Sequence, residues 1–132
     1  MKKIVIRFNA PVILTFALLS LLALLLGNWT NGATTYQYFS VYRASLSDPL
    51  TYLRFFGHVL GHADYEHYMS NMLLILLVGP GLEEKYGSGT MVWTIAVTAL
   101  VTGLVHFVFF PGSVLLGASG VVFMMIVLSS FT

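Results

Sequence analysis

Charged residues are absent from two long stretches of the chain, and apolar residues fill most of both. No Asp, Glu, Lys or Arg lies between Arg7 and Arg43, and none follows Lys85. Gaps of this length can hold spanning helices of roughly 20 residues each. The apolar runs therefore predict a single domain, residues 1–132, with four helices at about 11–29, 65–82, 91–110 and 118–132.

The composition favours a membrane protein over a soluble one. Hydrophobic residues make up 58% of the chain and charged residues 8%, whereas about a quarter of the residues in a soluble domain are charged. The last expected helix has only 15 residues from Ala118 to Thr132, which is too few for a full crossing. We therefore expect an all-α membrane protein, a polytopic helical bundle that is incomplete.

The first expected helix, residues 11–29, sets the orientation. A signal peptide is the alternative, but the apolar run is longer than the roughly 7–15 residues of such peptides and no A-x-A-like site follows it. Lys2, Lys3 and Arg7 precede the helix, and basic flanks stay on the cytoplasmic side. We expect an integral, multi-pass membrane protein with a cytoplasmic N-terminus and the lipid bilayer as a partner.

A polar connection from Asn31 to about Asp64 follows on the outer side. It is rich in aromatic residues, which favour the membrane–water interface, so we expect it to lie on or partly in the bilayer. Its seven aromatic residues are Tyr36, Tyr38, Phe39, Tyr42, Tyr52, Phe55 and Phe56.

Other features of the composition exclude several classes of function. The chain has no cysteine, so disulfides and thiolate metal sites are excluded. A formal net charge of +1 without a basic stripe argues against a nucleic-acid partner. No cofactor is predicted.

Polar side chains of two expected helices converge at the outer end of the bundle. His67 and Asn71 are four residues apart, so they share one face of a helix near its outer end. Ser119 begins the next helix but one, on the same side of the membrane, between small residues. A helix start offers unpaired N–H groups, and small neighbours give access, as a serine nucleophile requires. Interhelical hydrogen bonding and close packing are the alternative roles.

Three motifs then carry a resemblance to a known family. Residues 58–71 resemble the HxxxHxxxxHxxxN signature of rhomboid intramembrane proteases, and residues 79–87 resemble their GxxxExxxG element. Residues 117–120 match their GxSG motif, and all three occur in order over roughly residues 40–132. The resemblance implies a rhomboid-like bundle of which about four of six core transmembrane helices are present.

The resemblance also implies an activity and a set of roles. Rhomboids are serine endopeptidases that cleave transmembrane protein substrates with a Ser–His dyad facing the extracytoplasmic side. Ser119 corresponds to the nucleophile, His67 and Asn71 to the side chains that stabilise the oxyanion, and Gly117 to the oxyanion loop. The remaining motif positions are expected to be structural. His58 and His62 would order the cavity entrance, Glu83 would hold the cytoplasmic end by hydrogen bonds, and Gly79 and Gly87 would permit close packing. Gly120 is a further structural position of the GxSG motif.

The general base is not assigned. In rhomboids it is a histidine of the sixth helix, which the 132 residues do not include. His106 lies at a compatible depth, but the family pattern places no base there, and an interhelical hydrogen bond is its expected role. Because a serine without a base is a weak nucleophile, this chain alone is expected to be inactive or nearly so. The missing helices would belong to a longer chain or to a second chain.

Two other classes of function stay open. A noncatalytic rhomboid-like protein would bind transmembrane helices without cutting them. A zinc site would leave Asn71 and the Ser119 motif unexplained, so no metal is predicted. Its candidate ligands are His58, His62, Asp64, Glu66 and His67.

Arg43 gives a looser match. With Tyr42 before it, Arg43 resembles the arginine of the family's Trp-Arg motif in the external loop. Capping or anchoring of the loop at the headgroups is its alternative role.

Overall fold

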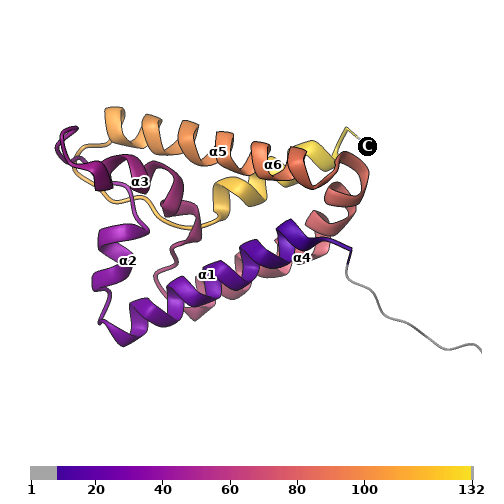
Figure 1. Cartoon of the computed structure of the whole chain (residues 1–132), viewed down its shortest axis with the longest axis horizontal. Coiled ribbons are helices and arrows are strands. Elements are labelled where there is room, and N and C mark those ends of the chain that lie inside the picture. Colours follow the sequence, from indigo (N-terminus) through magenta and orange to yellow (C-terminus); the bar gives the residue numbers. More distant parts are fainter. Residues whose placement is uncertain (1–8, 132) are drawn as a thin grey trace, which may run out of the picture.

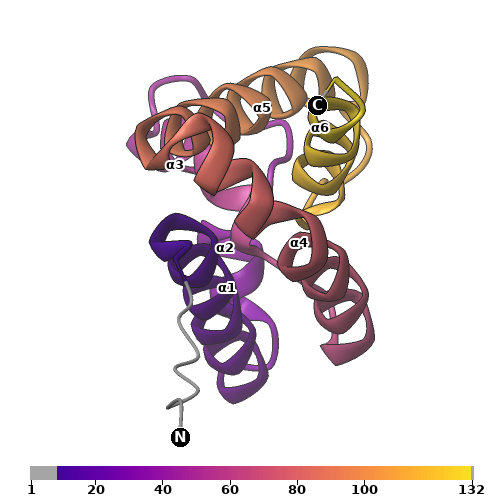
Figure 2. The same cartoon turned by 90° about the vertical axis from the view of Figure 1, so that its right-hand side faces the viewer.

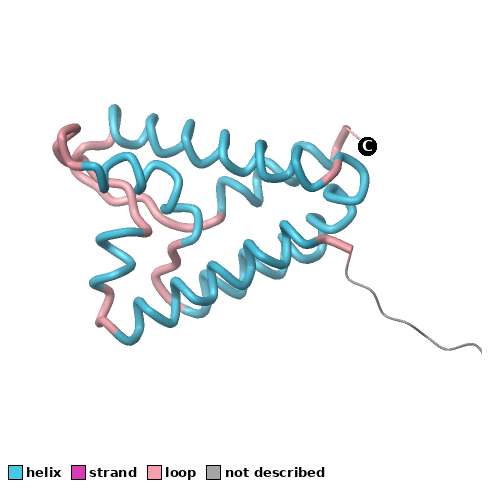
Figure 3. Tube along the Cα trace, viewed as in Figure 1, coloured by secondary structure: helices cyan, strands magenta, loops and turns pink. Residues whose placement is uncertain are grey.

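The computed structural model describes residues 9–131, and helices joined by loops make up this part of the chain (Figures 1 and 3). Three shorter helices lie between the first and second long helices, and only Gly87 separates the second long helix from the third. The elements are α1 (Pro11–Trp29), α2 (Ala33–Tyr38), α3 (Pro49–Gly57), the 3-10 helix η1 (His58–Leu60), α4 (Tyr65–Tyr86), α5 (Ser88–Phe109) and α6 (Ser119–Ser129).

Local sequence signals account for where the helices begin. Pro11 and Pro49 occupy the first turns of α1 and α3, where a missing N–H costs nothing. Asp48 and Asp64 precede α3 and α4 and accept hydrogen bonds from backbone N–H groups of the first turn, at 3.0 and 2.9 Å. Such caps satisfy donors that have no partner inside the helix.

The helix bounds differ from the expected ones mainly at the inner turn and in the long connection. α4 continues through Pro80 to Tyr86, beyond the expected end at residue 82, and Gly87 then reverses the chain with φ +91°. Only glycine adopts such a φ without strain, so the turn is placed by Gly87. The connection 31–64 contains α2, α3 and η1, which the apolar pattern does not predict. Thr132, the expected end of the last helix, lies outside the described residues.

Two helices, α1 and α5, are long and apolar enough to cross a membrane, by length and composition. α6 is apolar but has only 11 residues. α4 has 22 residues but carries Glu66 in its first turn and a charged segment, Glu83 to Lys85, near its end. By length and composition, the described part of the chain therefore contains two candidate spans, where the apolar pattern predicts three crossing helices and the start of a fourth.

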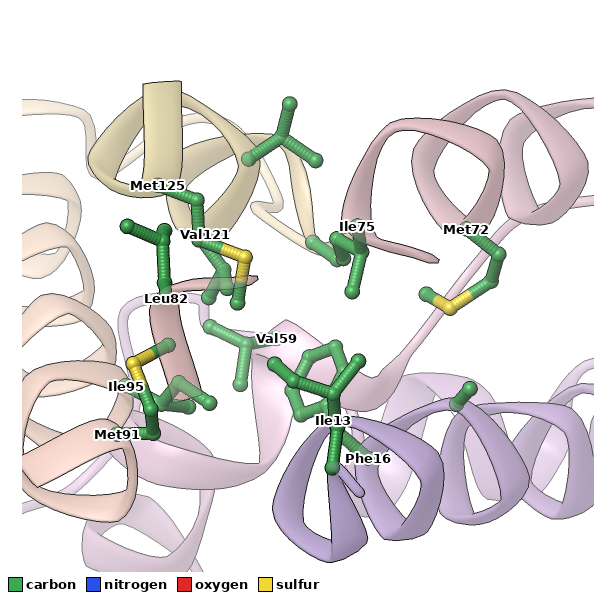
Figure 4. Packing of buried hydrophobic residues seen from close by; sticks show 14 of the residues in the cluster. Ile13, Phe16, Val59, Met72, Ile75, Leu82, Met91, Ile95, Val121 and Met125 are labelled. Carbon is green, nitrogen blue, oxygen red and sulfur yellow. The ribbon is translucent and has the colours of Figure 1, made fainter. Parts of the chain in front are cut away.

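The core lies where α1, α4, α5 and α6 meet. α1 and α4 lie side by side, and α5 and α6 lie on the other side of the bundle (Figures 1 and 2). In an apolar solvent such packing stabilises through van der Waals contact, since lipid is as apolar as the core. Figure 4 shows the central side chains, which include Ile13, Phe16, Val59, Met72, Ile75, Leu82, Met91, Ile95, Val121 and Met125.

Gly79 lets α1 and α4 approach closely. A Cβ atom at this position would lie only 2.8 Å from Cδ1 of Ile13. Because Ile13 is completely buried, its side chain has little room to move away. The close contact expected of Gly79 is therefore a contact between α4 and the first turn of α1.

Glu83 joins three elements at the inner end of the bundle. Its carboxylate accepts hydrogen bonds from the backbone N–H groups of Val12, at 3.0 Å, and Ile13, at 2.9 Å. The hydroxyl of Ser88, the first residue of α5, donates to the same carboxylate at 2.7 Å. A negative charge at a helix N-terminus is favourable, and here it also satisfies unpaired donors of α1. The side chain of Glu83 thus holds α1, α4 and α5 together.

Substitution Glu83→Gln should lower the free energy of unfolding by about 1–3 kcal/mol, because the amide removes the charge and one acceptor oxygen from a buried site. Unfolding of the purified chain in detergent, followed by circular dichroism, measures the change. Glu84→Gln is the matched control, since Glu84 is exposed. Equal loss in both variants would contradict this role for Glu83.

Candidate active site

A cavity of about 230 Å³ lies where α4, the start of α6 and the segment before α4 meet. Three of its lining residues, His67, Asn71 and Ser119, are those that the sequence predicts to converge. Gly117 and His62, two further motif positions, also line it. The remaining lining residues are Ala63, Ser70 and Leu116.

The α4 wall of the cavity is formed by the first two turns of the helix. His67 is three residues after the capping Asp64, and its imidazole is 69% exposed. Asn71 lies one turn further along the same face. Ser70, beside them, donates its hydroxyl to the carbonyl of Glu66 at 2.9 Å. The first turns of α4 thus present an imidazole and an amide to the cavity.

Ser119 is the first residue of α6, and its side chain is exposed. At this position its backbone N–H has no carbonyl partner within the helix. The structure gives the Ser119 hydroxyl no hydrogen bond to other groups of residues 9–131. The hydroxyl and the backbone N–H of one residue are therefore both available at the cavity.

The loop before Ser119 is held by hydrogen bonds to distant segments. Leu115 pairs with Val41 through two backbone hydrogen bonds, at 2.8 and 2.9 Å, in an isolated antiparallel bridge. The N–H of Gly117 donates to the carbonyl of His58 at 2.8 Å. Gly117 has φ +117°, a conformation that side chains with a Cβ rarely adopt. The shape of the loop therefore depends on glycine at this position.

His62 connects the two walls of the cavity. Its Nε2 lies 3.1 Å from Nδ2 of Asn71 and 3.4 Å from the backbone N of Ala118. Because both of these groups are donors, Nε2 is the acceptor and the ring proton is on Nδ1. Burial lowers the pKa of His62, which favours the neutral ring that such an acceptor requires. His62 thereby fixes the orientation of the Asn71 amide.

His58 and His62 are both buried, and His62 also lines the Ser119 cavity. Each is only 2% exposed. Nε2 of His58 lies 2.8 Å from the carbonyl oxygen of Ala99 in α5, so this side chain joins η1 to α5. Both rings are buried because η1 and the following loop pass between the long helices.

The zinc alternative receives no support from the geometry. Within residues 9–131 there is no group of three or more His, Cys, Asp or Glu side chains that could hold a metal. His58 and His62 lie in η1 and the following loop rather than on one helical face, and their Nε2 atoms contact different partners.

His106 is not beside Ser119. Its Nε2 lies 3.0 Å from the carbonyl oxygen and 3.2 Å from the hydroxyl of Ser113, in the turn after α5. Its ring also stacks on Phe110. His106 therefore stabilises the turn between α5 and the Ser119 loop and is not placed as a base.

Two arginines anchor the external connection, and the sequence pattern pointed to only one. Arg43 donates from Nε to the carbonyl of Phe107, at 2.9 Å, and from Nη2 to that of Val108, at 3.0 Å, which caps the end of α5. Arg54 is 5% exposed, donates from Nε to the carbonyl of Gln37 at 2.7 Å, and has its guanidinium over the ring of Tyr42. The sequence feature that could have identified Arg54 is that it is the one charged residue within the otherwise mostly apolar sequence of α3.

A comparison with protein families decides the classification. The Rhomboid domain family matches residues 49–132, which include α3 to α6 and all the residues that line the cavity. The chain belongs to the rhomboid family. This confirms the resemblance and the expected fold class, an incomplete all-α rhomboid-like bundle. Members of the family are generally serine intramembrane proteases. Family membership and the two apolar helices α1 and α5 together indicate a membrane protein. No match was found among curated proteins.

Substitution Gly117→Ala in this rhomboid domain should destabilise the Ser119 loop by about 1–2 kcal/mol, because an L-residue with a side chain is strained at positive φ. Gly120→Ala is the control, since its Cβ would lie 3.5 Å from Thr102 Cγ2, an ordinary contact. Unfolding in detergent should separate the two variants. A Gly120→Ala variant that is the less stable of the two would contradict this account.

Proposed function

We propose that this chain carries the nucleophile and the oxyanion site of an intramembrane serine endopeptidase that cleaves transmembrane protein substrates. The observation that supports this most strongly is the cavity that brings Ser119 together with His67 and Asn71. Family membership supports the reaction class.

The donors around Ser119 suit a tetrahedral intermediate. Ser119 Oγ would attack the carbonyl carbon of the scissile peptide bond, and the carbonyl oxygen would become an oxyanion. The Asn71 amide has two N–H groups, and His62 accepts one of them, which leaves the other for the oxyanion. The backbone N–H of Ser119 and the His67 imidazole would be further donors. Donors that are already oriented stabilise the developing charge most effectively in a site of low dielectric.

The general base would come from outside residues 9–131. Within these residues no histidine is hydrogen-bonded to the Ser119 hydroxyl, and His106 is engaged by Ser113. The base takes the hydroxyl proton and later gives it to the leaving amine, so both steps are slow without it. We therefore expect this chain alone to be inactive or nearly so. Partner helices, from a longer chain or a second chain, would supply the base.

A rhomboid-like protein that binds transmembrane helices without cutting them is the second candidate. The observation in its favour is that, within residues 9–131, no histidine is hydrogen-bonded to the Ser119 hydroxyl. In that case the cavity would need no oxyanion donors, and Ser119 would not be more reactive than other exposed serines.

Labelling of Ser119 by a fluorophosphonate distinguishes the two candidates. At alkaline pH, where hydroxide replaces the base, the chain in detergent should be labelled, and Ser119→Ala should not be. Asn71→Ala should slow labelling by roughly 10²-fold, the typical effect of removing one oxyanion donor. Ser70→Ala is the control, because Ser70 lines the same cavity but its hydroxyl donates to Glu66. Labelling that does not depend on Ser119 or Asn71 would favour the noncatalytic candidate.

The orientation of the site follows from α1. A second cavity, of about 490 Å³, joins the C-terminal end of α1 at Gly27 and Asn28 to His62 and Leu116, which also line the Ser119 cavity. The candidate site is therefore near the end of α1 that is opposite to the basic N-terminus. With that N-terminus cytoplasmic, the site would face the extracytoplasmic side.

Cysteine substitutions can measure this orientation, because the chain has no cysteine of its own. In intact cells a membrane-impermeant maleimide should label Trp29→Cys, since Trp29 is 83% exposed at the end of α1. Lys85→Cys, exposed at the other end of the bundle, should be labelled only after the cells are opened. The reverse pattern would overturn the proposed orientation.

A further inference from the structure

Tyr68, in the first turn of α4, contacts both α1 and the buried His62. Its hydroxyl donates to the carbonyl oxygen of Ala17 in α1 at 2.9 Å. The centroid of its ring lies 5.7 Å from that of the His62 imidazole, and the two ring planes are at 90°. Tyr68 does not line the Ser119 cavity itself. Its link with the candidate active site is therefore the contact with His62.

The ring of Tyr68 is held in place by its surroundings. A tyrosine hydroxyl in apolar surroundings takes a hydrogen-bond partner, and here the partner is a carbonyl of the neighbouring long helix. Ala17, which supplies this carbonyl, is itself only 6% exposed. The Tyr68 ring also packs against the main apolar core of the bundle. The position of the ring is thus fixed by the packing of α1 on α4.

The hydrogen bonds of His62 do not by themselves hold its imidazole firmly. Nε2 lies 3.1 Å from Nδ2 of Asn71 but 3.4 Å from the backbone N of Ala118, and a bond of the second length is weak. A perpendicular aromatic neighbour is a favourable contact and restricts the turning of the imidazole. Tyr68 and Asn71 are three residues apart, so they lie on one face of α4. That face therefore offers His62 both a ring contact and a hydrogen bond.

We propose that Tyr68 is a positioning residue of the oxyanion site, which holds the His62 imidazole in the orientation that directs the Asn71 amide. This proposal rests on the proposed function of Asn71 and Ser119. If the imidazole turned, Nε2 would move away from the amide, and Asn71 would lose the acceptor of one of its two N–H groups. The other N–H would then no longer be oriented in advance, as a donor to an oxyanion should be. Tyr68 thereby couples the packing of α1 on α4 to the reactivity of Ser119.

Fluorophosphonate labelling of Ser119 at alkaline pH measures the effect of Tyr68 on the site. Tyr68→Leu removes the ring and should slow labelling by roughly tenfold, less than the roughly 10²-fold expected for loss of the Asn71 donor itself. Tyr68→Phe keeps the ring and should be labelled within about threefold of the wild-type rate, because one interhelical hydrogen bond in a membrane contributes little. Tyr65→Leu is the matched control and should be labelled as the wild type is, since Tyr65 lies in the same turn but is 51% exposed.

A double variant separates positioning from a general loss of stability. Once Asn71 is replaced by alanine, the His62 imidazole has no amide to direct. Tyr68→Leu combined with Asn71→Ala should therefore be labelled no more slowly than Asn71→Ala alone. A purely structural loss would slow labelling equally in both backgrounds, because independent effects add. Additive effects of the two substitutions would overturn the proposal.

Nitrogen NMR of the four histidines, in chain with isotope-labelled histidine, needs no reaction at Ser119. In the wild type, His62 should have a neutral ring with its proton on Nδ1, and its signals are identified by their loss in His62→Asn. Tyr68→Phe and Tyr65→Leu should keep these signals, whereas Tyr68→Leu should average them between the two tautomers. Unchanged signals in Tyr68→Leu would overturn this proposal alone. Labelling of the wild type that does not depend on Asn71 would instead contradict the proposed function on which it rests.

Discussion

Backbone N–H and C=O groups need partners wherever the chain leaves a helix in an apolar environment, and this constraint shapes the whole molecule. Several helix ends and loops are satisfied by groups from distant parts of the sequence. The Glu83 carboxylate receives the first amides of α1, and Arg43 donates to the last carbonyls of α5. Leu115 pairs with Val41 ahead of the Ser119 loop. These bonds place the helix ends relative to one another, and the apolar core fills the space between them.

The candidate active site depends on the same kind of bond. Asp64 fixes the start of α4 locally, but the Ser119 loop and the Asn71 amide are positioned by residues far away in the sequence. The Ser119 loop is fixed by the carbonyl of His58 and by Val41, and the Asn71 amide is fixed by His62. A site assembled in this way has its donors oriented before substrate arrives, which is the condition for strong electrostatic stabilisation of an oxyanion. It also explains why the buried histidines of the motif matter without contacting Ser119.

The chemistry of the chain is divided. Ser119 and its proposed oxyanion donors line one cavity, but none of the described histidines is hydrogen-bonded to the Ser119 hydroxyl. The family shows the reaction class to which such a site belongs.

The amino-acid sequence by itself determined the helical membrane class, the family and the three motifs, because these depend on periodicity, charge gaps and local spacing. α1 has the bounds that its apolar run predicts, and Gly117 was recognised as a loop glycine. Spacing along the chain also predicted that His67, Asn71 and Ser119 would meet.

Only the tertiary structure decided the rest. It showed that Arg54 and His62 are buried and hydrogen-bonded to other segments, and that His106 is hydrogen-bonded to Ser113. It also showed that the connection 31–64, which is polar in sequence, contains α2, α3 and η1. These features depend on hydrogen bonds between residues far apart in the sequence, where a partner cannot be identified from neighbours. The apolar groove between α1 and α5 likewise depends on tertiary packing, since α1 packs mainly against α4 and α5 mainly against α3. Local patterns determine which segments are helices, and long-range contacts determine what lies between them.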